Sequence, residues 1–139
     1  MAGDWKEKVQ RIIVQRDLCS YMNETKWNAL RSAMMQEMPF QPPYIVKYLF
    51  DETCYEESKL QSDLFHTGDW YDALSADGQY FHASFAIEWI KIRPYYLKKA
   101  GKYIAPQEIH AEKELTAILE KYHIPYEETD GIYCIYGYR

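Results

Sequence analysis

The histidines of this chain are the side chains best suited to acid–base or metal chemistry, and their spacing decides what they can do. His82 lies in Phe81-His82-Ala83-Ser84-Phe85, the strand-borne His-x-Ser form that a pair of imidazoles needs to act as base and acid across one phosphate. A second such motif is required, and His66-Thr67-Gly68 has its hydroxyl residue next to the histidine instead of two positions on. His66 with Asp69 or with Cys54 could bind a metal if the fold brought them together, but no spacing matches a zinc site. We therefore expect no metal and no cofactor.

Nucleophilic chemistry has no sequence signature either. The chain has no Gly-x-Ser-x-Gly motif and no glycine-rich phosphate loop. Cys19, Cys54 and Cys134 are an odd number, far apart and without a Cys-x-x-Cys pair, which favours three reduced thiols in a cytoplasmic protein. One enzymatic alternative stays open, a small hydrolase whose site the fold assembles from the residues His66, Asp69, His82 and Glu88.

The distribution of charge is more informative than any catalytic motif. The chain of 139 residues has a net charge of -5, which argues against general binding to nucleic acid. Residues 51–77 contain eight acidic residues and one lysine, with aromatic residues between them, whereas residues 91–102 contain five basic residues and no acid. Aromatic anchors among steering acids are typical of a contact surface for a basic protein. The predicted partner-binding residues are Tyr55, Asp63, Phe65, Asp69, Trp70, Tyr71 and Asp72, and we expect Trp70 to be partly exposed.

The weaker nucleic-acid alternative rests on the basic stretch at residues 91–102, with tyrosines such as Tyr103 that could stack on bases.

The elements that must position these residues follow from hydrophobic spacing and from breakers. Three helices are predicted, at residues 4–22, 24–38 and 106–122. Strands are predicted at residues 44–50, 69–74 and 80–92, and in a terminal hairpin over 126–138. Asn23 should cap the second helix, and Pro106 should begin the third. Between the strands we expect a loop with a short helical piece at 51–64 and a basic connection at 95–103.

This element order predicts an α+β fold with a mostly antiparallel sheet of about four to six strands. The two N-terminal helices precede the sheet, and one long helix precedes the C-terminal hairpin. We expect a single domain over residues 1–139, in which the helix up to residue 22 is an appended element. In strand 80–92, Ile87, Trp89 and Lys91 should face one way, and Glu88, Ile90 and Ile92 the other.

Three pieces of the chain together resemble a known family. They are Met22-Asn23-Glu24-Thr25-Lys26-Trp27-Asn28-Ala29-Leu30, then Gly68-Asp69-Trp70 with Ile87-Glu88-Trp89-Ile90, and finally the segment IPYEETDGIYCIYGY at residues 124–138. The chain resembles, over residues 20–138, a family of small bacterial proteins classed as a domain of unknown function. The resemblance implies a bacterial, cytoplasmic, single-domain protein and carries no catalytic residue over. In style, small acidic aromatic-rich domains of this kind are similar to immunity proteins of toxin systems.

These observations predict a non-enzymatic protein-binding module, with an immunity-like inhibitor of a basic toxin or effector as its specific form. One alternative is a self-associating protein, in which the terminal hairpin with Tyr133, Tyr136 and Tyr138 forms an exposed edge that pairs with a second copy. The N-terminus shows no secretory signal, and no stretch is apolar for the ~20 residues that a membrane helix needs. We therefore expect a cytoplasmic protein that has no membrane segment.

Overall fold

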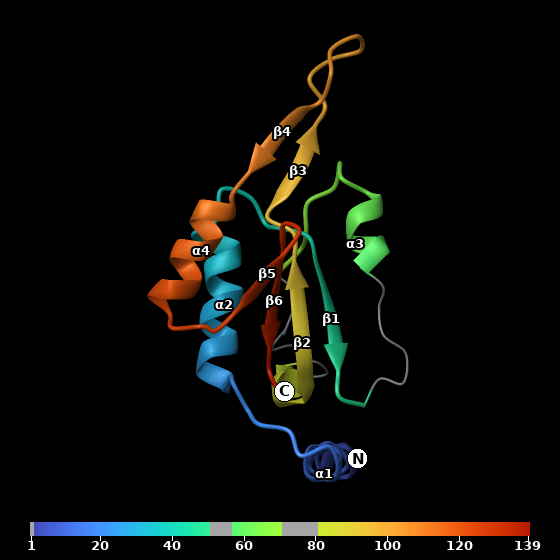
Figure 1. Ribbon diagram of the computed structural model, residues 1–139, viewed down its shortest axis with the longest axis vertical. Helices are drawn as coiled ribbons and strands as arrows, with labels where there is room; N and C mark the ends of the chain where they lie inside the picture. Colours follow the sequence, from blue (N-terminus) through green and yellow to red (C-terminus); the bar gives the residue numbers. More distant parts are fainter. Residues whose placement is uncertain (1, 51–56, 71–80) are drawn as a thin grey trace.

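A computed structural model describes residues 2–50, 57–70 and 81–139 of the chain (Figure 1). Within these residues lie four α-helices, namely α1 (Ala2–Gln15), α2 (Glu24–Gln36), α3 (Glu57–Ser62) and α4 (Glu112–Lys121). The six strands are β1 (Tyr44–Tyr48), β2 (Ile87–Ile92), β3 (Tyr95–Lys98), β4 (Gln107–His110), β5 (Glu127–Thr129) and β6 (Ile132–Tyr136). A 3₁₀ turn, η1 (Phe81–Ala86), leads into β2. All strand pairs are antiparallel, so the predicted α+β class is confirmed.

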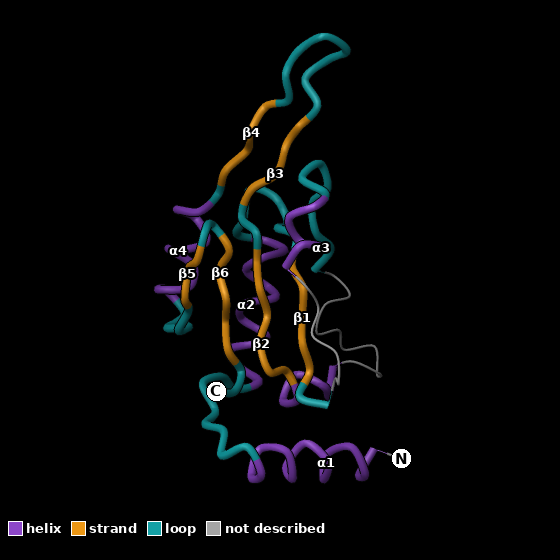
Figure 2. Tube along the Cα trace, turned by 45° about the vertical axis from the view of Figure 1, so that its right-hand side comes forward, coloured by secondary structure: helices purple, strands orange, loops and turns teal. Residues whose placement is uncertain are grey.

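The main sheet has the strand order β1-β2-β6-β5, and helices α2 and α4 lie together on one of its faces (Figures 1 and 2). Ile90 and Ile135, which are paired across β2 and β6, point from the sheet into the core that these helices close. The helices contribute Leu30 and Leu115, both fully buried. Burial of such side chains is the main stabilisation available to a sheet with helices on one face.

Two local predictions are confirmed in detail. The Asn23 side chain accepts a 2.8 Å hydrogen bond from the Lys26 backbone N–H and so caps α2. The terminal hairpin turns at Asp130 and Gly131, which have φ angles of 53° and 81°. Two successive positive φ values match the tight turn that an Asp-Gly pair favours between antiparallel strands.

The N-terminal helix is shorter than expected. Helix α1 ends at Gln15, and Asp17 follows with a φ of 53°, which a continuing helix does not allow. The chain then pairs with its own C-terminus, because the Cys19 and Arg139 backbones exchange two hydrogen bonds of 3.0 Å. Long-range backbone pairing thus replaces the helical turns that the apolar spacing predicts over residues 18–22.

Helix α1 lies across one end of the main sheet (Figure 2) and is held there by packing and by charge. Val9 is fully buried in a small cluster with Leu49. Glu88 on β2 accepts hydrogen bonds from Arg16 at 3.0 Å and from Lys47 on β1 at 2.6 Å. Burial alone would raise the pKa of the Glu88 carboxyl, but these hydrogen bonds outweigh it, so its pKa lies below the usual value of 4.5.

The lowered pKa of Glu88 makes the attachment of α1 dependent on pH. A carboxyl group whose pKa is lower in the folded protein stabilises the fold above its unfolded pKa, and this contribution is lost as the pH falls through the folded pKa. We expect Glu88→Gln to lower the free energy of unfolding by about 1–2 kcal/mol at neutral pH, since the Lys47 ammonium loses its charged acceptor. Urea unfolding of both proteins between about pH 7 and pH 3 should show the difference shrinking below about pH 4.5. A difference that stays constant down to the lowest pH would contradict this assignment.

Three predicted elements differ from the structure. The helix predicted from residue 106 begins only at Glu112, because residues 107–110 form β4 and pair with β3, with Tyr95 opposite His110. The strand predicted from residue 80 begins only at Ile87, after η1. Of the strand predicted at 69–74, residues 69 and 70 have no strand geometry, and residues 71–74 lie outside the described residues.

The expected facing of β2 is also partly wrong. Ile87 lies in the main core with Ile90 and Ile92 instead of on the side of Trp89. The reason is a shift in the pairing register between Lys47 and Tyr48, where β1 meets the start of β2. Such an irregularity adds one residue to a strand and changes the side to which the neighbouring side chains point.

Candidate functional site

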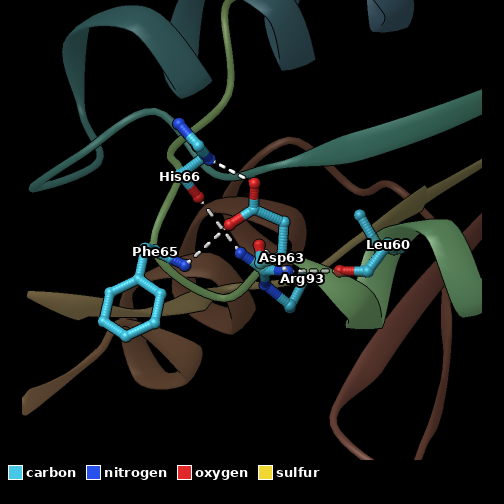
Figure 3. A network of polar contacts seen from close by, with 5 residues as sticks. All are labelled: Leu60, Asp63, Phe65, His66 and Arg93. Atoms are coloured by element: carbon cyan, nitrogen blue, oxygen red, sulfur yellow. Dashed lines mark hydrogen bonds and ion pairs between the residues drawn. The ribbon is translucent and has the colours of Figure 1, made fainter.

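A buried arginine fixes the backbone of the acidic region next to the sheet (Figure 3). Arg93, directly after β2, is 1% exposed. Its guanidinium donates hydrogen bonds to the backbone carbonyls of Leu60, of Asp63 at 3.0 Å and of His66 at 3.1 Å, and a further one to that of Tyr95 at 3.0 Å. Three carbonyls from the end of α3 and the loop after it converge on one planar cation, so the backbone over residues 60–66 has a defined shape.

Three side chains of this segment, those of Asp63, Phe65 and His66, are exposed to solvent. The Asp63 carboxylate accepts a 3.2 Å hydrogen bond from the Phe65 backbone N–H and also contacts the His66 imidazole. The hydrogen bond with His66 is the main reason that the pKa of Asp63 lies below its usual range, so Asp63 is ionised at neutral pH. Phe65 lies between Asp63 and His66 in the chain and is 43% exposed. We call the exposed side chains of Asp63, Phe65, His66 and Asp69 the loop surface.

The basic stretch of the sequence lies directly beside this loop. The Leu97 backbone N–H on β3 donates a 2.6 Å hydrogen bond to the Leu64 carbonyl. The Lys99 ammonium lies 5.7 Å from the centre of the Phe65 ring, within the range of a cation–π contact. The fold thus joins an acidic and a basic segment that the sequence separates by about 30 positions.

The β3–β4 hairpin then continues away from the main sheet and ends in a free loop (Figure 1). Residues 98–106 form this hairpin tip, and all of them are exposed. Tyr103 is 90% exposed and Ile104 is 65% exposed. The sequence predicts only a basic connection here, and Ile104 is not among the residues that it indicates as contacts.

The predicted partner-binding residues have different fates. Asp63, Phe65 and Asp69 are exposed on the loop surface, whereas Tyr55, Tyr71 and Asp72 lie outside the described residues. Trp70 is 0% exposed, so the expectation that it is partly exposed is wrong. Its indole N–H donates a 2.8 Å hydrogen bond to the Pro42 carbonyl, and its ring lies 4.3 Å from that of Tyr44. The indole finds both an apolar contact and an acceptor inside, which is why it is buried beside an acidic segment.

The residues proposed for a hydrolase do not converge where their side chains are described. His66 contacts Asp63 instead of Asp69, and both partners are exposed. Glu88 lies near the other end of β2, engaged by Arg16 and Lys47. The His82 side chain lies outside the described part of the structure.

Among the described residues, no three His, Cys, Asp or Glu side chains gather as they would around a metal ion. In the same part of the chain no helix has the length and apolar character needed to cross a bilayer.

Comparison with known proteins places the chain in a family. Residues 9–139 match a family of unknown function (DUF6678). The chain belongs to this family. The DUF6678 match includes the second half of α1, where Val9 packs under the sheet, and it covers both the loop surface and the hairpin tip. No curated protein matches the chain significantly, and no solved structure does either.

Proposed function

We propose that this DUF6678 protein is a non-enzymatic protein-binding module that contacts a basic partner protein through the loop surface. The observation that carries the proposal is the exposed Phe65 ring on a backbone that the buried Arg93 holds in place. An aromatic side chain on an ordered loop loses little conformational entropy on binding, which favours affinity.

The negative charges of the loop surface support a partner protein that is basic. Asp63 is ionised and accepts a hydrogen bond from the Phe65 backbone, and Asp69, four positions after Phe65, is exposed. The Lys99 ammonium lies 5.7 Å from the centre of the Phe65 ring, so an arginine or lysine of a partner would bind the ring by displacing Lys99 or by using the opposite face. Acids near such an anchor speed the approach of a positively charged protein. An immunity-like inhibitor of a basic toxin is the specific form of this proposal, and a bacterial, cytoplasmic setting would suit it.

The test uses the intact tagged protein as bait in lysate of its source organism at low salt, with elution by rising salt. We expect the wild-type protein to capture a basic protein from the lysate. The Phe65→Ser variant should not capture it. Asp63→Asn/Asp69→Asn, which removes charge and preserves shape, should slow association of the purified partner by about tenfold at low salt and much less at high salt.

A matched control is Val14→Ser, which removes an apolar side chain that is 76% exposed on α1, at the other end of the molecule from the hairpin (Figure 1). It should bind the partner as the wild type does. Equal capture by wild type, control and Phe65→Ser would show that the loop surface is not the contact. Capture of no basic protein would contradict the proposed partner class.

A further inference from the structure

The hairpin tip presents a second surface whose chemistry is opposite to that of the loop surface. It carries Lys98, Lys99 and Lys102, and residues 98–107 contain no acid. Tyr103 and Ile104 stand at its end, and among the large apolar side chains of the described residues Tyr103 is the most exposed and Ile104 follows Val14 as the third. Gly101 has a φ of 153°, and a side chain added there would meet Ile104 at 3.3 Å, so the tip has a specific turn that only glycine accommodates well.

The same chain offers a groove of matching character on another element. It lies along α4 beside β6 and has a volume of about 350 Å³. Thr116, Ala117 and Tyr133 are part of its lining, and the hydroxyl groups of Thr116 and Tyr133 lie 3.2 Å apart. Glu112, which already contacts the His110 imidazole at 2.8 Å, and Glu120 are its acidic residues, and Lys113 is the one basic residue in its lining. A lining that combines an aromatic ring, an alanine and two carboxylates complements a tip with apolar residues among lysines.

We infer that the hairpin tip of one copy docks in the α4 groove of a second copy of this chain. Local charge favours a second copy as the occupant, because the three lysines of the tip are opposite in sign to Glu112 and Glu120 of α4. Geometry favours it too, since α4 follows β4 in the chain and the hairpin tip extends well beyond α4 of its own copy (Figure 1). Two copies related by a two-fold axis would exchange tips, which gives two identical contacts and a closed dimer. This inference goes beyond the proposed function and uses other side chains.

Sedimentation velocity of the full chain across a range of concentrations tests the inference. Two small contacts predict a reversible dimer with a dissociation constant on the order of 10–100 µM at low salt. Raising the salt should weaken the dimer at least several-fold, because the lysine–glutamate contacts are solvent-exposed. Tyr103→Ser/Ile104→Ser should be monomeric at these concentrations, whereas the control Val14→Ser should dimerise like the wild type.

A charge exchange identifies the two sides of the contact. Lys102→Glu alone and Glu120→Lys alone should each weaken the dimer by about tenfold or more, because each homodimer then holds two like-charge contacts. A mixture of the two variants should recover dimerisation, since one contact of the mixed dimer is native and the other is reversed but complementary. Both side chains are exposed, so circular dichroism should show an unchanged fold.

Three results would overturn the inference. The first is a wild-type protein that stays monomeric up to about 1 mM at low salt. The second is a dimer that the tip substitutions leave intact, which would assign self-association to another face such as the β5 edge. The third is a monomer that shifts a labelled DNA duplex in a Lys102-dependent manner, which would assign the tip to nucleic acid. Neither the first nor the second result bears on the loop surface, which the Phe65 variant tests separately.

Discussion

Replacing Arg93 by methionine should lower the free energy of unfolding by about 3 kcal/mol. The substitution keeps the apolar part of the side chain and removes the cation that binds the carbonyls of Leu60, Asp63 and His66. Arg93 is 1% exposed, so the carbonyls facing it would lose their donor where water has little access. Urea unfolding followed by tryptophan fluorescence measures the loss.

The position of the arginine makes this prediction specific. Arg93→Lys keeps the charge but cannot reach several carbonyls in one plane, so it should recover less than half of the lost stability. Arg11→Met removes an exposed arginine from α1 and should change the free energy of unfolding by less than about 0.5 kcal/mol. If Arg93→Met were as stable as Arg11→Met, the loop over residues 60–66 would not depend on this arginine, and the support for an ordered loop surface would fall.

Elements of this fold whose hydrogen bonds are local follow from the sequence. The N-cap at Asn23 satisfies a backbone donor three residues later, and the Asp130-Gly131 turn sets the register of β5 against β6. Both signals operate within a few residues, so no other part of the chain is needed to interpret them. The α+β class follows from the order of these local elements.

Elements whose partners are distant do not follow from local patterns. The helix predicted from Pro106 begins later than expected, because residues 107–110 pair with the backbone of β3. The first helix ends earlier than predicted, because residues 19–20 pair with the C-terminus. Arg93 lies within a run of basic residues, and nothing in its neighbours distinguishes a buried arginine from the exposed lysines around it. For the same reason the charge pattern alone could not show that Lys99 lies beside Phe65.

Trp70 provides the sharpest test of the difference between a buried aromatic residue and a partner-binding one. Trp70→Ala should lower the free energy of unfolding by about 3–5 kcal/mol, because it removes a fully buried side chain that packs on Tyr44. Trp70→Phe retains most of the ring but leaves the Pro42 carbonyl without its 2.8 Å indole donor, and it should cost about 1–2 kcal/mol. Thermal and urea unfolding of both variants measure these losses.

The matched exposed aromatic residue is Tyr103, which is 90% exposed. Tyr103→Ala should leave the free energy of unfolding within about 0.5 kcal/mol of the wild type. Where Trp70→Phe is still folded, it should bind the basic partner as the wild type does, because Phe65 and the acids around it are unchanged. A Trp70→Phe protein of wild-type stability that lost its partner would instead show that the indole becomes exposed on binding, and the loop surface would then have to include it.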